Sequence, residues 1–371
     1  MAAINAGAEI PYISSALVFL SVLAVYCFSR GPLNWHSEHA IQAAAWLSGH
    51  FYVDSWRDLL HEKIVWRGHW YILHPPLPAV VMLPFVAAGA GNQLFPLIFI
   101  GSIGAVLIYR LTESLWLTAF FAFGTPYWYA ATTGDPWSYC LALSCMLTAA
   151  ALLAARNSRP GWTGVWAGLS ALARYDMAMV LPVYAVLLKG RRVRYFIPVG
   201  AAVVLYVLNA ELRFGKPYDI ALWQWWKIDA PTLGLKVADG PFSLKYLPMG
   251  LYTALFLSPG FTPYFPWLRL SSAGQSLLTT SPAFLLALRA SLKDRRILLL
   301  WSAVILEMSG ALCVWSNGVA QWGARYWIQA YPFLFALMAR QPVDQMAKVL
   351  IVASIAMNVF AMWYVRSNYP F

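Results

Sequence analysis

The chain has 371 residues, of which 60% are hydrophobic and 11% are charged, and its mean hydropathy is +0.59. Soluble domains carry roughly 25% charged residues, so this composition excludes a water-soluble fold and predicts an all-α polytopic membrane protein. The net charge of +11 does not indicate a nucleic-acid partner. We attribute it to basic cytoplasmic loops and to cations that face anionic membrane lipids.

The cysteines and the N-terminal segment give further information on the class of membrane protein. No C-x-x-C pair is present, so neither a zinc site nor a disulfide framework is indicated. The first apolar segment has no basic region before it and no clear cleavage motif after it, which favours a retained helix over a signal peptide. We therefore expect residues 1–371 to form a single membrane-embedded domain without a separate soluble domain.

The hydropathy pattern predicts about ten to twelve transmembrane helices, some too short or too rich in proline to cross fully, because a span needs about 20 residues. The hydrophobic segments lie near 10–29, 76–90, 94–110, 114–131, 137–155, 161–188, 195–212, 246–258, 277–289, 297–315, 326–339 and 347–366.

Basic loops set the expected orientation, because Lys and Arg concentrate in cytoplasmic loops. The strongest clusters are Lys189, Arg191, Arg192 and Arg194, and Arg289, Lys293, Arg295 and Arg296. With these inside, the N-terminus lies in the cytoplasm and the polar stretch 31–75 forms a first outer loop. For the number of membrane crossings to agree with this orientation, the segment 76–90, which holds three prolines, must not cross the membrane fully. The expected location is a bacterial inner membrane.

Segment 161–188 carries the charged triplet Arg174-Tyr175-Asp176 at its middle. Charges inside an apolar run are costly unless they line a cavity or pair with each other. The pattern predicts two short helices that meet at the triplet. An Arg174–Asp176 ion pair that only fixes the bend explains the triplet equally well.

The first outer loop concentrates the chemistry of the chain. All six histidines fall between residues 36 and 74, with acids and tryptophans among them. Ser37 or Asn34 is placed to cap an interfacial amphipathic helix that begins near Glu38. A carboxylate there can accept a proton from a hydroxyl group, or it can simply complement the helix dipole. The alternative for the whole loop is an aromatic interfacial segment with incidental histidines.

Other outer loops add candidate residues, each with a structural alternative. Asp135, before Pro136, suits a helix N-cap. The loop 213–219 is basic and precedes a tryptophan cluster that suits sugar faces or headgroup anchoring. Arg325 opens an apolar helix, where a guanidinium can clamp a phosphate or act as a snorkelling anchor.

In order and spacing these pieces resemble the GT-C superfamily, whose members transfer sugars from polyprenyl-phosphate carriers and include protein O-mannosyltransferases and the lipid A aminoarabinose transferase. The resemblance covers most of the chain. It rests on an acid at the start of a long first outer loop, a proline pair entering the next helix, and an acid in the second outer loop. It continues with the motifs Phe214-Gly215-Lys216-Pro217-Tyr218, Leu278-Thr279-Thr280-Ser281-Pro282 and Trp322-Gly323-Ala324-Arg325-Tyr326. Glu38 stands where the family usually has Asp, and His74 stands where Lys often precedes the prolines.

The resemblance implies an inverting glycosyltransferase with its active site on the periplasmic face, a polyprenyl (undecaprenyl-type) phosphate-sugar donor, and a lipid, glycan or protein acceptor. It implies Glu38 as the catalytic base and Asp135 as a second acid. The donor phosphate would contact Arg325, His74, Arg213 and Lys216. The sugar would contact His39, Trp35, Tyr129, Tyr218 and Tyr326.

No cofactor is expected for this reaction, and no nucleotide-binding loop is present. A divalent metal held by His36, Glu38 and His39 is a weaker alternative, based on their shared helix face. Two other functions stay open. One is a transporter or flippase of lipid-linked sugars or solutes, because charges lie within apolar segments. The other is a non-catalytic subunit of an envelope-polymer complex.

Overall fold

The computed structural model describes residues 12–32, 37–59, 62–188, 190, 192–232, 234–271, 274–315 and 322–368. Over these residues the protein is mostly helical, with 71% helix and 4% strand. Two short hairpins hold the strands, β1 (Lys63–Trp66) with β2 (His69–Ile72) and β3 (Gly260–Phe261) with β4 (Leu268–Arg269).

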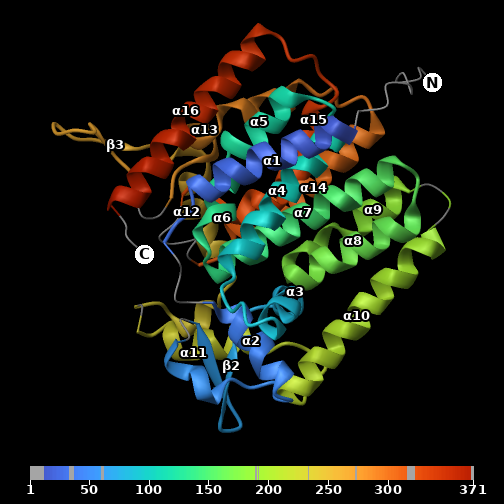
Figure 1. Ribbon diagram of the computed structural model, residues 1–371, viewed down its shortest axis with the longest axis vertical. Helices are drawn as coiled ribbons and strands as arrows, with labels where there is room; N and C mark the ends of the chain where they lie inside the picture. Colours follow the sequence, from blue (N-terminus) through green and yellow to red (C-terminus); the bar gives the residue numbers. More distant parts are fainter. Residues whose placement is uncertain are drawn as a thin grey trace.

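The helices of the first half of the chain surround a central pair, α4 and α7 (Figure 1). In chain order they are α1 (Tyr12–Phe28), α2 (Glu38–Leu47), η1 (Asp54–Leu59), α3 (Pro76–Ala87), α4 (Leu94–Thr112), α5 (Leu115–Phe123), α6 (Tyr127–Thr133), α7 (Pro136–Arg156), α8 (Pro160–Ala173), η2 (Tyr175–Val180) and α9 (Leu181–Leu187).

The second half adds an outer helix, α10, along one edge, and returns to pack against α4 and α7 through α15 (Figure 1). Its elements are α10 (Arg192–Phe214), α11 (Ala221–Asp229), η3 (Val237–Asp239), η4 (Leu244–Tyr246), α12 (Leu247–Leu251), η5 (Tyr252–Phe256), α13 (Leu277–Thr280), η6 (Pro282–Arg289), α14 (Arg295–Leu312), η7 (Arg325–Ala330), α15 (Tyr331–Met338) and α16 (Gln345–Asn368).

Among the described residues, four helices are long and apolar enough to cross a membrane by themselves: α4, α7, α10 and α16. We expected about ten to twelve helices, some too short or too rich in proline to cross fully, and several apolar segments are broken. Gly124 and Pro126 divide 114–131 into α5 and α6, and Ser281-Pro282 ends α13 where η6 begins. Four such helices indicate a membrane-associated, polytopic protein.

The bend at 174–176 shows both features considered from the sequence, namely two helices that meet there and an ion pair that fixes the junction. Helix α8 ends at Ala173, the backbone of Arg174 is extended at φ −149° and ψ 113°, and η2 and α9 follow. Arg174 and Asp176 form an ion pair with a 2.6 Å contact. The two short helices and the pair that fixes their junction are therefore both present.

Helix α3 has 12 residues, which is too short for a span that needs about 20. Both of its flanks lie at the same side of the molecule. His74, before α3, contacts Glu38 at 3.1 Å, and Gln93, after it, accepts a hydrogen bond from the backbone N–H of His39. Both ends of the segment 76–90 therefore lie at the same side of the molecule. The count of membrane crossings between the basic loops required this arrangement.

The first outer loop holds more than helices. After α2 and η1 the chain forms the β1–β2 hairpin, whose turn places Arg67 at φ 51° and Gly68 at φ 84°. Positive φ at both central residues is the geometry of a tight two-residue hairpin turn. This hairpin, which the sequence analysis did not predict, lies beside α2 and α11 at the lower end of the view in Figure 1.

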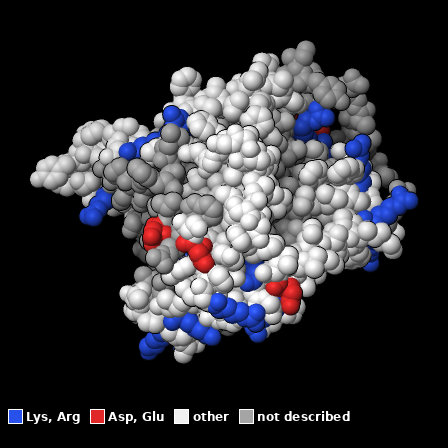
Figure 2. All heavy atoms as spheres, turned by 60° about the horizontal axis from the view of Figure 1, so that its bottom comes forward, with Lys and Arg blue, Asp and Glu red and all other residues white. Residues whose placement is uncertain are grey.

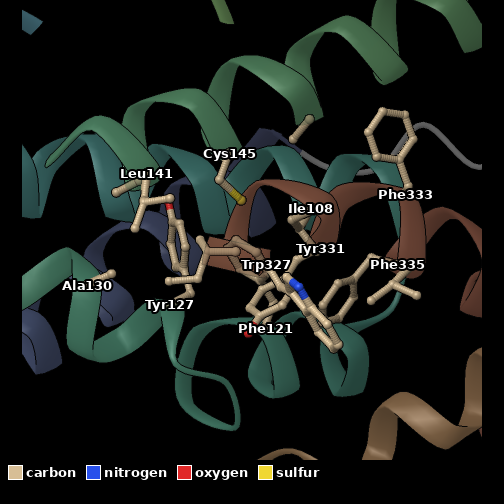
Figure 3. Packing of buried hydrophobic residues seen from close by; sticks show 14 of the residues in the cluster. Ile108, Phe121, Tyr127, Ala130, Leu141, Cys145, Trp327, Tyr331, Phe333 and Phe335 are labelled. Atoms are coloured by element: carbon tan, nitrogen blue, oxygen red, sulfur yellow. The ribbon is translucent and has the colours of Figure 1, made fainter. Parts of the chain in front are cut away.

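Aromatic side chains fill the core between α4, α7 and α15 (Figure 3). Phe121 packs on Tyr127 with ring centroids 4.3 Å apart and on Phe335 at 5.3 Å. The hydroxyl of Tyr26 donates to the carbonyl of Ala122, which joins α1 to this core. The interior is therefore dense, and it holds the helix ends described next in fixed positions.

The helix ends define two sides of the molecule. We call the side that holds Glu38, His39 and His74 the histidine end, and the side that holds Arg156, Arg296 and Arg340 the arginine end. Helix α7 runs from the first to the second, over 21 residues. Figure 2 shows one face with charged residues near its margins and a broad uncharged area between them.

Candidate active site

A buried acid–histidine pair stands at the first turn of α2. Glu38 is the first residue of the helix and is 0% exposed, and its Oε2 lies 3.1 Å from Nε2 of His74, which is 5% exposed. The other oxygen, Oε1, accepts the backbone N–H of Glu62 at 3.3 Å. Ser37 occupies the N-cap position as predicted, but its hydroxyl accepts from the amide of Gln93 instead of capping α2.

His39 lies directly behind this pair and is fully buried. Its Nε2 is 3.0 Å from the carbonyl oxygen of Pro136, and its ring meets the ring of His74 edge-on at 5.1 Å. Burial, reinforced by the neighbouring His74, lowers the pKa of His39 to about 3. A neutral His39 can therefore donate a hydrogen bond to Pro136 and fix the start of α7 against α2.

Trp137 connects the pair to the rest of the site. Its ring meets the ring of His74 edge-on at 5.9 Å, and its indole N–H donates to Oε2 of Glu62 at 2.9 Å. Desolvation raises the pKa of Glu62, against the opposing effects of His74 and the Trp137 hydrogen bond. Glu38 also raises the pKa of Glu62, whose backbone N–H it accepts, so the two acids are neighbours in the site.

Arg325, from η7 in the C-terminal part of the chain, lies on another side of the site. It is 8% exposed, and its guanidinium lies 5.6 Å from the ring centroid of Trp137 and 5.3 Å from that of Tyr326. Its Nε has no hydrogen-bond partner, and no carboxylate among the described residues lies within ion-pair distance of it. A buried cation without an anionic partner is costly, so this position favours an anionic ligand.

Asp135 and Tyr129 lie within electrostatic reach of Arg325. Asp135 is the N-cap of α7 and accepts the backbone N–H of Ser138 at 2.8 Å. Its capping role is therefore present, and its charge also faces the cation. Tyr129 belongs to the short helix α6 and is buried.

A second polar layer lies behind Tyr326. Arg174 stacks over the Tyr326 ring at 5.5 Å while it pairs with Asp176. On α14, the buried carboxyl of Glu307 accepts a hydrogen bond from the side-chain amide of Gln329. These contacts tie η7, which carries Arg325, to α8 and α14.

Three expected ligand residues have their contacts elsewhere. Arg213 is buried, and its two terminal nitrogens are engaged, because it pairs with Asp219 at 3.2 Å and donates to the carbonyl of Ile72. Lys216 lies 5.9 Å from the ring of Tyr218, which is 54% exposed. Arg213 therefore holds the hairpin to α10, and the expected roles of Lys216 and Tyr218 stay predictions.

The tryptophans of the loop after α10 divide between core and surface. Trp226 is buried and packs on Trp315 with centroids 5.9 Å apart, whereas Trp223 is about half exposed. The expected sugar contact Trp35 and the candidate metal ligand His36 lie outside the described residues. Within the described part of the chain, no group of three or more His, Cys, Asp or Glu is arranged to hold a metal ion.

Sequence reasoning missed Glu62, Trp137 and Gln93. Glu62 shares the polar stretch of the histidines and Trp137 follows Asp135-Pro136, so their positions were visible, but no spacing rule joined them. Gln93 bridges the backbone of His39 and the carbonyl of Gly134, at 3.3 and 2.7 Å. Only the packing of α2 against α4 and α7 explains its role.

The fold and the site define a class: a mostly helical, membrane-associated protein with a buried acid–histidine–arginine cluster at one end. No protein-family model matches the chain, and neither a curated protein nor a solved structure matches it.

Proposed function

We propose that the protein is an inverting membrane glycosyltransferase that moves a sugar from a polyprenyl-phosphate carrier to an acceptor hydroxyl. The observation that carries the proposal is Arg325, a buried guanidinium without an ion-pair partner among the described residues, beside the Glu38–His74 pair. A polyprenyl-phosphate donor presents a phosphate and an apolar tail at a membrane surface, and these match the charge and the location of the cluster.

In the proposed reaction the acceptor oxygen attacks the anomeric carbon of the sugar while the bond from that carbon to the phosphate oxygen breaks. The acceptor proton passes to the carboxylate of Glu38, and polyprenyl phosphate leaves with its electron pair. His74, 3.1 Å from Glu38, orients that carboxylate. Removal of a positioned base typically costs 100-fold to 10,000-fold in rate, in order of magnitude.

Arg325 stabilises the charge that develops on the leaving phosphate. A guanidinium offers paired donors that match phosphate oxygens, and fixed donors in a dry site need no reorganisation. Trp137 and Tyr326 hold the cation from two sides, at 5.6 and 5.3 Å. Asp135, Tyr129 and His39 are then positioned for the sugar or for the walls of its site.

The charge distribution supports a periplasmic active site in a bacterial inner membrane. The arginine end carries the exposed ion pairs Arg156–Glu113, Arg289–Asp344 and Arg340–Asp294. Basic residues favour the cytoplasmic side, which directs the histidine end outward. In this proposal the broken helices α5–α6 and η7–α15 complete, with the four long helices, a multi-pass bundle of the GT-C type.

The experiment measures sugar transfer from a panel of polyprenyl-phosphate sugars by the purified full chain. Glu38→Gln should lower transfer at least about 100-fold, and the matched control Glu211→Gln, an exposed acid on α10, should leave it unchanged. Full transfer by Glu38→Gln would remove Glu38 as the base. A wild-type chain that moves lipid-linked sugars across vesicles without transferring them would instead establish transport.

A further inference from the structure

A cavity opens at the arginine end, far from the cluster around Arg325. It has a volume of about 540 Å³, a size typical of small-molecule sites. Arg156, the last residue of α7, lines it, whereas Trp137 stands at the start of the same helix. At 1.5 Å per residue these positions are about 29 Å apart, so the cavity is separate from the candidate active site.

The inner walls of the cavity are apolar. They come from the ends of helices that meet at this side, and they include Leu111, Leu152, Leu187, Leu300 and Ala336. Such walls accept hydrocarbon, because apolar surface is stabilised when a nonpolar chain covers it. A purely ionic ligand would leave this surface without a partner.

The rim of the cavity is cationic. Arg156 donates to the carbonyls of Leu111 and Arg110, both at 2.9 Å, and pairs with Glu113 at 3.2 Å. Arg340 pairs with Asp294 at 2.6 Å. Two of the three lining arginines are therefore already neutralised and fixed in place.

Arg296 is the lining arginine for which no ion pair is seen among the described residues. It lines the cavity, it is exposed, and no carboxylate within the described ranges of the chain lies at ion-pair distance from its side chain. Its backbone N–H is anchored by Asp294, which caps α14. The guanidinium is thus free to bind an anion at the mouth of an apolar cavity.

We propose that this cavity binds an anionic phospholipid, with the phosphate on Arg296 and part of an acyl chain between the leucines. Basic pockets between membrane helices on the cytoplasmic side suit such headgroups. Of the helices whose ends form the cavity, α7 begins at Pro136, which contacts His39, and α15 follows η7, which carries Arg325. A bound lipid therefore fixes the ends of the elements that carry the candidate site.

The test uses the full chain, stripped of lipid in detergent, and counts bound lipids by native mass spectrometry. Phosphatidylglycerol and phosphatidylcholine with identical acyl chains are compared. Both lipids carry the phosphate, but the arginine rim repels the choline cation of phosphatidylcholine and so offsets the attraction of its phosphate. Phosphatidylglycerol should therefore bind at least about tenfold tighter. Arg296→Gln should abolish that preference, and Arg295→Gln, the exposed neighbour that does not line the cavity, should retain it.

A second variant and a second probe keep the ligand class decidable. Ala336→Phe fills the cavity from its wall and should weaken phosphatidylglycerol binding without changing any charge. Millimolar inorganic phosphate should displace the lipid poorly, because it lacks the apolar tail. Equal binding of both lipids, or equal loss in Arg295→Gln and Arg296→Gln, overturns the site. Displacement by phosphate alone, with no effect of Ala336→Phe, shows a soluble phosphate ligand and overturns the lipid assignment.

Discussion

The close approach of α8 to α10 makes Gly164→Ala a sharp test of the packing. A Cβ atom at residue 164 would lie 2.3 Å from the backbone oxygen of Tyr195 and 2.6 Å from Cγ of Pro198. One turn later, a Cβ at Gly168 would lie 2.9 Å from Cβ of Ala202. Two glycines four residues apart let membrane helices pack backbone to backbone. Neither Tyr195 O nor the proline ring can rotate away.

The size of the effect follows from these distances. A carbon–oxygen contact needs about 3.3 Å, so α10 has to retreat by about 1 Å. Overpacking of this kind costs about 1–3 kcal/mol. Gly→Ala also adds up to about 1 kcal/mol of helix propensity, which partly hides the clash. Gly200 supplies the matched control, because a Cβ there would meet nothing within 4 Å.

The assay is reversible unfolding in mixed micelles, followed by circular dichroism for Gly164→Ala and Gly200→Ala. Because both variants gain the same propensity, their difference isolates the clash, and Gly164→Ala should be less stable by about 1–3 kcal/mol. Equal stabilities would refute the α8–α10 contact. Sugar transfer should fall with stability in Gly164→Ala, since α8 leads into Arg174 and α10 carries Arg213 near its end.

Three further predictions concern the site. Trp137→Phe keeps an aromatic ring but removes the N–H that Glu62 accepts, so the pKa of Glu62 should rise further and infrared spectra should show its carboxyl group protonated up to higher pH; an unchanged titration contradicts this. His39 has a pKa of about 3 when folded and 6.5 when free, so the unfolded chain takes up the proton first, and stability should fall as pH drops from 6.5 towards 3; this slope should shrink in His39→Gln. Asp135→Ala should cost about 1 kcal/mol of unfolding free energy through the lost cap, and Asp135→Asn much less; equal losses would deny the cap.

The sequence predicted that four of the candidate residues come from segments that lie near one another. Glu38, His74, Asp135 and Arg325 stand far apart in the chain, yet their contacts converge on Trp137 and Tyr326. The alternation of apolar segments placed their loops on one side, because each crossing reverses the direction of the chain. Counting the membrane crossings also required that the segment 76–90 does not cross. Helix α3, which is short, agrees with this requirement.

The partners of these residues depended on tertiary packing. Arg213 was expected to contact the donor phosphate, but it pairs with Asp219 and donates to the distant carbonyl of Ile72. Glu62 enters the site because the chain folds back at the hairpin turn of Arg67 and Gly68. Hydropathy did not locate the break at Gly124 and Pro126 within the segment 114–131, since it records composition and not continuity.

The most direct measurement of the central claim compares the binding of a polyprenyl phosphate with that of the uncharged polyprenol to the full chain in lipid nanodiscs. If Arg325 receives the phosphate, the wild-type chain should bind the phosphate at least about tenfold tighter. Arg325→Gln should lose that preference, and Lys227→Gln, an exposed cation on α11, should keep it. Equal affinity of the wild-type chain for both lipids, or an undiminished preference in Arg325→Gln, would contradict the account.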